Sequence, residues 1–563
     1  MGKIASLRHQ PSPLWTPGRL ALLSVLLAAL ALRLYGLNWD QGQYLHPDER
    51  YVIQYVMQGR IHFDWPPDLP TLLNPETSGL NPRSDDPATG HYREFAYGAL
   101  PLLVTDGAAE VLTWLTDRDW HASDRVYLLG RTFSALLDAL TVAIVYLIGR
   151  TAFSARVGLF AAALAALAPM SIQLAHFLTT DSWLTFFVAL CLLFSINAGD
   201  TGLHRWFAAA GAGFGLAMAT KGSVFTLAAI IVAAVVVDVI RRRQLGGSWI
   251  SSGAAGIERL ALAGVCSIVA FGAFEPFALI APEPFLRSLE TQANIVRGVF
   301  DVPFTRQYVG TTPVIYQLEQ LIRWGFGPAA GILMLAGLPI AAWRLWKRPN
   351  AGTVLVLGWI AIYSMVIAIP ETKFLRYLAP LVPVLAVVGG VALEAGWRFI
   401  ARRWNFRLAT GITAATLCCA ALWTAAFSSV YAGENPRIAA SRWIFANIPN
   451  GSALSGELWD DGLPKEFGPG LTASDRQFES VGFDMYRDYS NQSDLTVLGE
   501  TLARESLTYP VSQALVEGSY KQARDVLIGI SSVLGDLPQT NRDQLALLLE
   551  RAANQISGSA ALR

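Results

Sequence analysis

The chain has 563 residues, of which 53% are hydrophobic and only 15% are charged, and its formal net charge is zero. Charged residues make up about a quarter of an ordinary soluble domain, so this composition excludes a soluble protein and predicts a polytopic α-helical membrane protein. The even balance of acidic and basic residues gives no sign of a nucleic-acid partner. All four cysteines, Cys191, Cys266, Cys418 and Cys419, fall inside apolar runs, which excludes a disulfide framework outside the membrane.

Apolar stretches of about 20 residues, the length that spans a bilayer, recur along the chain up to residue 430. We count eleven, and the stretches between 180 and 240 follow one another so closely that two of them could be divided differently. They lie at roughly 17–37, 126–149, 156–175, 180–199, 205–221, 223–240, 258–280, 323–345, 351–370, 377–397 and 408–430.

Basic residues predict the orientation of these spans. With the N-terminus inside, every expected inner connection is basic, as the positive-inside rule requires of a cytoplasmic loop. The residues concerned are Lys3, Arg8 and Arg19; Arg150 and Arg156; Arg205; Arg241, Arg242, Arg243 and Arg259; Arg344, Lys347 and Arg348; and Arg398, Arg402, Arg403 and Arg407. We therefore expect a multi-pass protein of the cell membrane with a cytoplasmic N-terminus and an extracytoplasmic C-terminus. A cleaved signal peptide is the alternative for the first span, because Ala29-Leu30-Ala31 resembles a cleavage site.

Three regions between or after the spans are long enough to lie outside the membrane. Residues 38–125 form a first outer loop with an amphipathic run near Tyr92–Thr113 that predicts interfacial helices, and residues 281–322 form a second. Residues 1–430 then form a transmembrane module, and residues 431–563 form an extracytoplasmic soluble domain. The residue pattern of this domain predicts strand and turn near 457–464 and helix from about 511, and together these predict an α/β or α+β fold.

Charged residues gather at the outer side of this topology. They are Asp48 and Glu49 in the first outer loop, Arg131 in span two, His176 and Asp181 between spans three and four, Lys221 at the end of span five, Glu275 at the end of span seven, and Glu371, Lys373 and Arg376 before span ten. Cations that break the positive-inside bias are better explained by an anion that they hold than by topology. The pattern predicts a membrane-interface active site for a phosphate-bearing lipid.

Four short motifs carry a resemblance to a known family. They are the Asp48-Glu49 pair, His-Phe-Leu-Thr-Thr-Asp at 176–181, Gly-Leu-Ala-Met-Ala-Thr-Lys-Gly at 215–222, and Arg-Tyr-Leu-Ala-Pro-Leu-Val-Pro at 376–383. Over roughly residues 15–430 the chain resembles the polyprenyl-phosphate-dependent glycosyltransferases of the GT-C superfold. It is most similar to the branch that holds the protein O-mannosyltransferases and the lipid A aminoarabinose transferases. The C-terminal region carries no such resemblance.

The resemblance implies that a sugar on a polyprenyl phosphate is transferred to the hydroxyl of an acceptor, which could be a protein, a glycolipid or a polysaccharide. The acceptor must lose a proton, so a carboxylate has to lie within hydrogen-bond reach. By similarity Asp48 is this base, attack opposite the phosphate inverts the anomeric carbon, and Glu49 is the second choice. Asp181 could orient a cation or the acceptor.

The leaving lipid phosphate needs cationic donors in a water-poor site. By the same resemblance Lys221 and Arg376 are the first candidates to bind it, and Arg131 and Lys373 are the second. The acidic residues Asp48, Glu49 and Asp181 could together hold Mg²⁺ or Mn²⁺, as carboxylates do in the oligosaccharyltransferase branch. The branch that this chain resembles more closely implies no metal and no other cofactor.

Simpler interpretations of these residues stay open. Asp48 and Glu49 could only cap a helix that begins at Pro47, Asp181 could only cap span four, and Lys221 could be a lysine that extends to the membrane surface. At the level of the whole protein, a transporter or flippase of a lipid-linked sugar is one alternative and a non-catalytic envelope scaffold is another. The sequence has no internal repeat of the kind that many transporters show.

Overall fold

The computed structural model describes residues 16–57, 61, 68–86, 89–300, 302–457, 462–465 and 476–483. The chain divides into two compact units. The first comprises Met1–Trp39 and His46–Gly433, and the second comprises Asp40–Leu45 and Glu434–Arg563.

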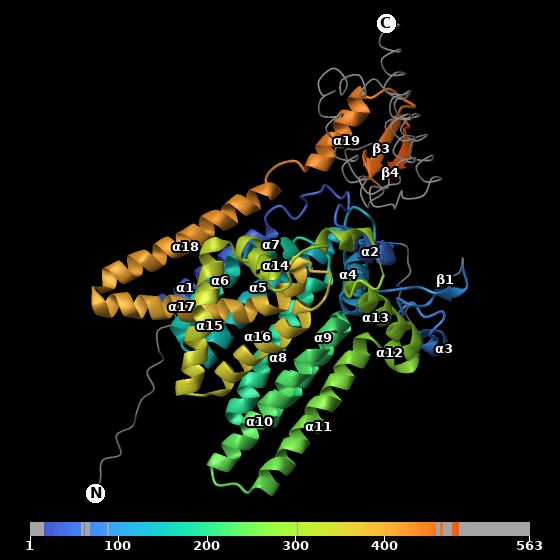
Figure 1. The fold of residues 1–563 in the computed structure, drawn as a ribbon. Helices are drawn as coiled ribbons and strands as arrows, with labels where there is room; N and C mark the ends of the chain where they lie inside the picture. Colours follow the sequence, from blue (N-terminus) through green and yellow to red (C-terminus); the bar gives the residue numbers. More distant parts are fainter. Residues whose placement is uncertain are drawn as a thin grey trace, which may run out of the picture. The chain divides into compact units, whose positions relative to one another are not determined.

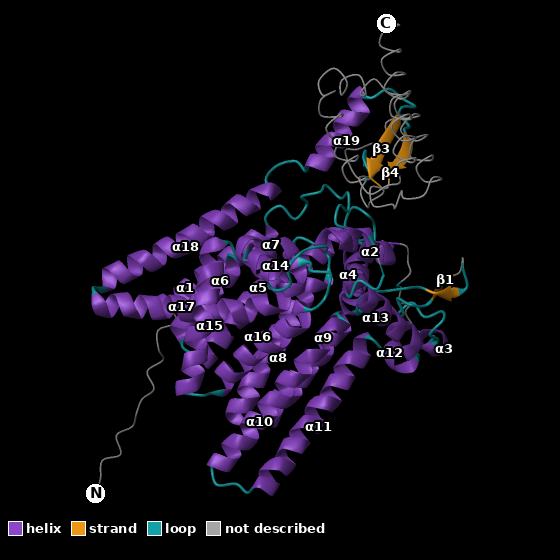
Figure 2. Ribbon diagram, viewed as in Figure 1, coloured by secondary structure: helices purple, strands orange, loops and turns teal. Residues whose placement is uncertain are grey.

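The first unit is built mainly from helices (Figures 1 and 2). Within the described part of the chain, nine helices are long and apolar enough to cross a membrane. They are α1 (Pro17–Leu34), α5 (Val126–Ala152), α8 (Thr180–Thr201), α10 with the preceding turn η1 (Gly222–Gln244), α11 (Trp249–Phe274), α15 (Pro328–Lys347), α16 (Ala351–Ala368), α17 with the preceding turn η4 (Leu375–Arg403), and the stretch that begins with α18 (Phe406–Ser428). The predicted fold class, a multi-pass helical membrane protein, is confirmed.

The other two predicted spans are not single long helices. One is a pair of helices, α6 (Ala155–Ala166) and α7 (Pro169–Ala175), that are bent by 59° relative to each other. The other is α9 (His204–Thr220), which has 17 residues. In addition, Arg259 lies inside α11 and not in the inner connection where the sequence places it, because its guanidinium binds the Asp238 carboxylate of α10 at 2.7 Å.

A buried arginine supports the bend between α6 and α7. Pro169 has no N–H, so the carbonyl of Ala165, four residues earlier, lacks its α-helical donor and accepts a longer bond of 3.3 Å from the Ala168 N–H. Arg33 of α1 donates to the carbonyls of Ala165 at 3.2 Å and Ala166 at 3.1 Å, and it forms an ion pair of 2.5 Å with Asp138 of α5. Arg33 thus supplies additional donors to the carbonyls at the bend.

Two helices form the centre of the bundle. In the apolar stretch of α8, 78% of the residues are buried, and in that of η4–α17, 94% are buried. In the apolar stretches of α1 and α11, only 11% of the residues are buried. The turn η4 packs against α8. Side chains at the start of α8 and within η4 are therefore held by the best-packed part of the molecule.

Shorter elements form the connections of the first unit. The first long connection contains α2 (Pro47–Met57), α3 (Leu69–Leu73), α4 (Leu100–Thr116) and an antiparallel pair of strands, β1 (Asp85–Asp86) and β2 (His91–Tyr92). The second contains α12 (Phe277–Ile280), α13 (Pro282–Val296), η2 (Pro303–Tyr308), α14 (Ile315–Gln320) and the π-helical turn η3 (Leu321–Gly325). The turn η5 (Ser429–Tyr431) follows α18.

The described part of the second unit contains helix and sheet. The helix α19 (Pro436–Asn447) is followed by β3 (Ala453–Glu457), which pairs in parallel with β4 (Glu479–Phe483). Arg437 of α19 donates to the Leu45 carbonyl at 3.3 Å, and Arg442 donates to the Gln41 side chain at 2.8 Å, so α19 binds the segment Asp40–Leu45. The turn predicted after residue 457 and the helix predicted from about 511 fall largely or wholly outside the described residues.

Candidate functional site

Asp48 and Arg376 form an ion pair at one end of the bundle. Asp48 lies in the first turn of α2, where the helix dipole favours acidic side chains, and Arg376 lies in η4. The Arg376 Nη1 donates to Asp48 Oδ2, and each side chain is 22% exposed. Burial raises the pKa of Asp48, but Arg376 and the other surrounding donors and charges outweigh this effect and hold the pKa below its ordinary value. Asp48 is therefore a carboxylate at neutral pH.

Asp181 and Lys221 form a second ion pair. Asp181 lies in the first turn of α8, and Lys221 follows the last residue of α9, where the backbone has turned to an extended conformation. The Lys221 Nζ lies 3.2 Å from Asp181 Oδ1, and both side chains are largely buried. Asp181 therefore orients Lys221 in this structure.

Two tyrosines connect the pairs into one cluster. The ring of Tyr377 lies 5.3 Å from Lys221 Nζ and 6.0 Å from the Arg376 guanidinium carbon. The ring of Tyr97 lies 5.8 Å from Lys221 Nζ, and Tyr97 is among the groups that lower the pKa of Asp48. Cation–π contacts of this kind hold cations in place without neutralising them. Asp48, Asp181, Lys221 and Arg376, four of the seven residues predicted for the site, therefore meet in this cluster.

Glu49 and Arg131 lie apart from that cluster in a fully buried pair. Arg131 Nε and Nη2 bind the two oxygens of Glu49 at 2.8 and 2.5 Å, and both side chains are 0% exposed. Glu49 Oε1 also accepts from the Leu178 N–H at 2.8 Å, and Arg131 donates to the Leu37 carbonyl at 2.7 Å. The pair connects α2 to α5, so we assign Glu49 and Arg131 a role in holding α2 in place.

Lys373 also has a different environment from the one the sequence suggests. Its Nζ donates to the Glu371 carbonyl at 2.8 Å and lies 3.9 Å from the Glu371 carboxylate, and its side chain is buried. None of the described contacts of Lys373 joins it to Asp48, Lys221 or Arg376.

Two histidines near the cluster have structural contacts. Burial lowers the pKa of His46 to about 4, so the ring is neutral at pH 7, and it packs on Phe177 with 4.2 Å between ring centroids. The ring nitrogens of His176 bind the carbonyls of Ile172 at 2.7 Å and Tyr35 at 2.8 Å. His46 thus packs against an aromatic ring, and His176 joins two backbone carbonyls.

Sequence reasoning missed Tyr97 and Tyr377. Both side chains are uncharged and stand among other aromatic residues, so no composition or charge signal separates them from ordinary interfacial tyrosines. Burial raises the pKa of Tyr97 well above its ordinary value, so its phenol is protonated at neutral pH. Tyr377 follows Arg376 in the motif at 376–383, and that adjacency was its only signal.

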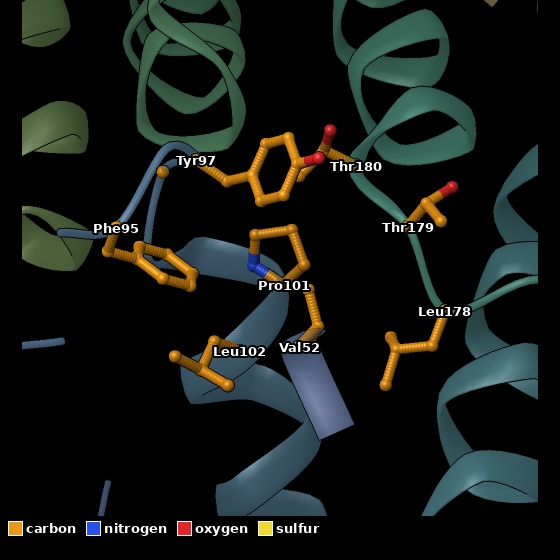
Figure 3. Close-up of a pocket in the computed structure, with 9 residues that line it drawn as sticks. Val52, Phe95, Tyr97, Pro101, Leu102, Leu178, Thr179 and Thr180 are labelled. Carbon is orange, nitrogen blue, oxygen red and sulfur yellow. The ribbon is translucent and has the colours of Figure 1, made fainter. Parts of the chain in front are cut away.

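A small cavity lies beside Tyr97, and Figure 3 shows its lining. Its walls are mostly apolar. They come from α2, from the segment before α4 and the first turn of α4, and from the residues around the start of α8: Val52, Phe95, Tyr97, Gly98, Pro101, Leu102, Leu178, Thr179 and Thr180. The buried hydroxyls of Thr179 and Thr180 have no hydrogen-bond partner among the described residues.

The three acidic residues considered for a metal do not converge. Glu49 faces Arg131, Asp48 faces Arg376 and Asp181 faces Lys221. Within the described ranges, no group of three or more His, Cys, Asp or Glu side chains could hold a metal ion. The residues present therefore fit a network of ion pairs, and the expectation that no metal is needed stays a prediction.

Comparisons with known proteins bear on residues that contribute to this cluster. Residues 125–265 match the family model for dolichyl-phosphate-mannose-protein mannosyltransferase. That segment contains Arg131, Asp181 and Lys221, and over it the resemblance seen in the sequence is confirmed. No match was found among curated proteins.

Three of the solved structures that match this chain are as follows. ArnT from Cupriavidus metallidurans bound to undecaprenyl phosphate is 17% identical, with 79% of this chain and 82% of that chain covered and a TM-score of 0.47. The oligosaccharyltransferase of Archaeoglobus fulgidus in its apo form is 16% identical, and the match covers 77% of this chain but only 58% of that one, with a TM-score of 0.47. The Pmt1-Pmt2 protein O-mannosyltransferase complex of S. cerevisiae bound to the sugar donor is 18% identical, with 49% and 35% covered and a TM-score of 0.34.

Proposed function

We propose that this protein transfers a sugar from a polyprenyl-phosphate donor to an acceptor hydroxyl at the extracytoplasmic face of the membrane. The observation that carries the proposal is the cluster in which Asp48, Arg376, Asp181 and Lys221 form two ion pairs at the ends of the central helices. It offers two cations for a lipid phosphate and a carboxylate for a proton. The family match over residues 125–265 supports a lipid-linked donor.

Arg376 and Lys221 are the proposed phosphate ligands. Each is paired with a carboxylate in this structure, so the donor phosphate has to compete with Asp48 for Arg376. A guanidinium and an ammonium in a partly buried site stabilise the charge that grows on the phosphate as the sugar leaves. Aromatic contacts with Tyr377 keep both cations near the same point.

Asp48 is the proposed base. The acceptor oxygen forms a bond with the anomeric carbon while the bond from that carbon to the phosphate oxygen breaks, and the acceptor proton passes to the Asp48 carboxylate. Attack from the side opposite the phosphate inverts the anomeric configuration. When Arg376 binds the phosphate, Asp48 loses its main cationic partner, so its pKa rises and it becomes a better base. The ion pair in the free protein thus links donor binding to activation of the base.

The test of this proposal uses the purified full-length protein in lipid nanodiscs. Polyprenyl phosphates that carry mannose, glucose or aminoarabinose are supplied with an extract of envelope acceptors, and released polyprenyl phosphate is measured by mass spectrometry. We expect release with at least one donor from the wild-type protein and none from Asp48→Asn. Donor lipids that move across the membrane of sealed vesicles without losing their sugar would instead support a flippase, for which the buried Arg33–Asp138 pair at a helix bend is the favourable observation.

For the second unit we propose a role in positioning the acceptor. Its helix α19 binds the segment Asp40–Leu45, which directly precedes the helix that carries Asp48. Glu457, Trp459, Asp460 and Asp461 are the acidic and aromatic side chains that the sequence suggests for acceptor contacts, and these side chains lie outside the described residues. A variant that ends at residue 450, after α19, should still bind undecaprenyl phosphate but use acceptor less well. Full transfer by this variant would exclude the remainder of the unit from acceptor recognition.

The proposed orientation has a separate test. Single cysteines introduced at residues 247 and 500 of a cysteine-free variant are labelled with a membrane-impermeant maleimide in intact cells. We expect labelling at 500 and none at 247. The reverse result would place the cluster at the cytoplasmic face and contradict the proposed localisation.

A further inference from the structure

Arg376 lies against the ring of Phe374, which is two residues earlier in the chain. The guanidinium carbon of Arg376 is 4.7 Å from the centroid of the Phe374 ring, compared with 6.0 Å from that of Tyr377. The Tyr377 N–H donates to the Phe374 carbonyl at 3.0 Å, so the chain turns at this point. The guanidinium therefore has two kinds of partner, the Asp48 carboxylate and an aromatic face.

Other rings fix the position of Phe374. Tyr308 of η2 meets it edge-on, with 5.3 Å between the ring centroids and 83° between the ring planes, and Tyr308 is only 3% exposed. The rings of Phe304, in η2, and Tyr377, in η4, have centroids 6.1 and 5.6 Å from that of Phe374. These four rings, which we call the Phe374 cluster, join the second long connection to η4.

Backbone contacts join the same two parts of the chain. The Thr372 N–H donates to the Val296 carbonyl at 3.1 Å, and the Thr372 hydroxyl donates to the Ile295 carbonyl at 3.3 Å. The segment before η4 is thus held by the end of α13 at Thr372 and by η2 at Phe374. The ring of Phe374 therefore has a position beside Arg376 that does not depend on Arg376 itself.

An aromatic face has a different effect on Arg376 from that of a carboxylate. It attracts a guanidinium without neutralising the charge, whereas Asp48 neutralises Arg376 and has to be replaced when a phosphate binds. A free arginine side chain has many rotamers, and fixing it costs conformational entropy. Once Arg376 has left Asp48, Phe374 is the closer of the two rings that still restrict it.

We propose that Phe374 is a positioning residue of the phosphate site: its ring, fixed by Tyr308 from the second long connection, holds the Arg376 guanidinium in place when Asp48 no longer binds it. The inference rests on the proposed function, because it takes Arg376 as a phosphate ligand. A residue that only packs between η2 and η4 would have the same effect on phosphate binding with or without the Asp48 charge.

The test measures the Kd of undecaprenyl phosphate for the full-length protein in nanodiscs. When Asp48 is present, its carboxylate fixes Arg376 before binding, so Phe374→Leu should change the Kd by no more than about twofold. In Asp48→Asn, the ring is what fixes Arg376, so adding Phe374→Leu should raise the Kd about 3- to 30-fold, the cost of ordering one arginine side chain. Equal effects in the two backgrounds would overturn the inference.

Two further variants separate the aromatic face from the bulk of the side chain. Phe374→Tyr keeps the ring, so combined with Asp48→Asn it should retain the Kd of Asp48→Asn alone. A loss as large as that of Phe374→Leu would overturn the inference. When Arg376→Ala is also present, Phe374→Leu should have no further effect, because the group that the ring holds is gone. A further loss there would mean that Phe374 acts through packing alone.

Tyr308→Leu tests the contribution of the second long connection. In Asp48→Asn it should raise the Kd in the same direction as Phe374→Leu, because the ring of Phe374 loses its buried neighbour. Combined with Phe374→Leu it should add nothing, since both changes act through the same ring. Effects that multiply would overturn the part of the proposal that concerns Tyr308.

A matched control comes from another phenylalanine beside an arginine. The Arg344 guanidinium carbon lies 5.8 Å from the centroid of the Phe153 ring, and Arg344 binds Glu394 at 3.1 Å. Neither Phe153 nor Arg344 has a described contact with Arg376. Phe153→Leu removes the same kind of contact, so it should leave the Kd unchanged in both backgrounds. A rise in Asp48→Asn equal to that from Phe374→Leu would overturn the inference.

A structural readout is independent of phosphate binding. A cryo-electron microscopy map of Asp48→Asn should show the Arg376 guanidinium still over the Phe374 ring, and a map of Asp48→Asn with Phe374→Leu should show it displaced or without density. A guanidinium in the same place in both maps would overturn the inference. If the maps differ as expected but the wild type binds no undecaprenyl phosphate, the proposed function fails and the positioning of Arg376 by Phe374 stands.

Discussion

Asp48→Asn is expected to abolish transfer and, at the same time, to tighten the binding of a sugar-free polyprenyl phosphate. The substitution keeps the volume of the side chain and removes its charge, so it removes the proton acceptor and releases Arg376 from its ion pair. A positioned general base contributes typically 10²- to 10⁴-fold to a rate, which sets the expected loss in kcat.

The gain in binding follows from the environment of the ion pair. Both side chains are 22% exposed, so the pair is neither fully screened by solvent nor fully buried. Exposed pairs contribute up to about 1 kcal/mol, and we take about 1 to 2 kcal/mol for this partly buried pair. The lipid phosphate must break this contact in the wild type and not in the variant, so its Kd should fall roughly 5- to 30-fold.

The pH dependence of binding has a definite sign. The pKa of Asp48 is held low in the free protein, by Arg376 among other groups, and it rises when the phosphate takes Arg376. Binding therefore takes up a proton, and affinity should increase as the pH falls through the higher pKa of the bound state, until the lower pKa of the free state is reached. Asp48→Asn should lose this part of the pH dependence and keep the part that comes from the lipid phosphate.

Isothermal titration calorimetry or microscale thermophoresis with undecaprenyl phosphate in nanodiscs would measure both effects. If Asp48→Asn leaves the affinity for undecaprenyl phosphate unchanged or lowers it, the proposed competition between the Asp48 carboxylate and the phosphate is refuted. Near-normal turnover by the variant would remove Asp48 from the role of base and leave Asp181 as the candidate.

Three further predictions follow from the other contacts of the site. Lys221→Ala and Arg376→Ala should each weaken undecaprenyl phosphate binding and lower kcat by roughly tenfold or more, because a cation on the phosphate acts in both the ground state and the transition state; a change in only one of the two quantities would argue against phosphate contact. Glu49→Gln should lower the free energy of unfolding by about 3 to 5 kcal/mol, because Arg131 is left as a buried charge without its carboxylate. Thermal or denaturant unfolding in detergent measures this loss. Glu49→Leu combined with Arg131→Met should recover much of it. Turnover should persist in EDTA, and activity that disappears in the chelator and returns with Mg²⁺ or Mn²⁺ would show that the predicted absence of a metal is wrong.

The sequence alone predicted the class of the protein and the position of its membrane helices, because a bilayer imposes one length and one composition on every span. It also brought Asp48, Asp181, Lys221 and Arg376 into one candidate set, because charges near an apolar span need a reason to be there. Two of the three exceptions within the fold have local causes. Pro169 breaks a span, and Arg259 is tolerated inside α11 because Asp238 on α10 neutralises it.

Only the tertiary structure decided which of these charges act together. Asp48 and Glu49 are adjacent in the sequence, but successive residues of a helix point about 100° apart, so one faces Arg376 and the other faces Arg131 in the interior. Arg83 and Glu275 form a buried ion pair, with 3.2 Å between Nη1 and Oε2, although they are separated by 192 positions in the chain, and nothing in the local sequence of either residue predicts that they meet. Tyr97 carries no charge that a sequence pattern can register, and its position beside Lys221 arises from the close packing of Gly98 against α9 and the ion pair that binds its backbone. The sequence thus determines which residues are costly in a membrane, whereas the packing of helices determines which of those residues neutralise one another and which remain available to a substrate.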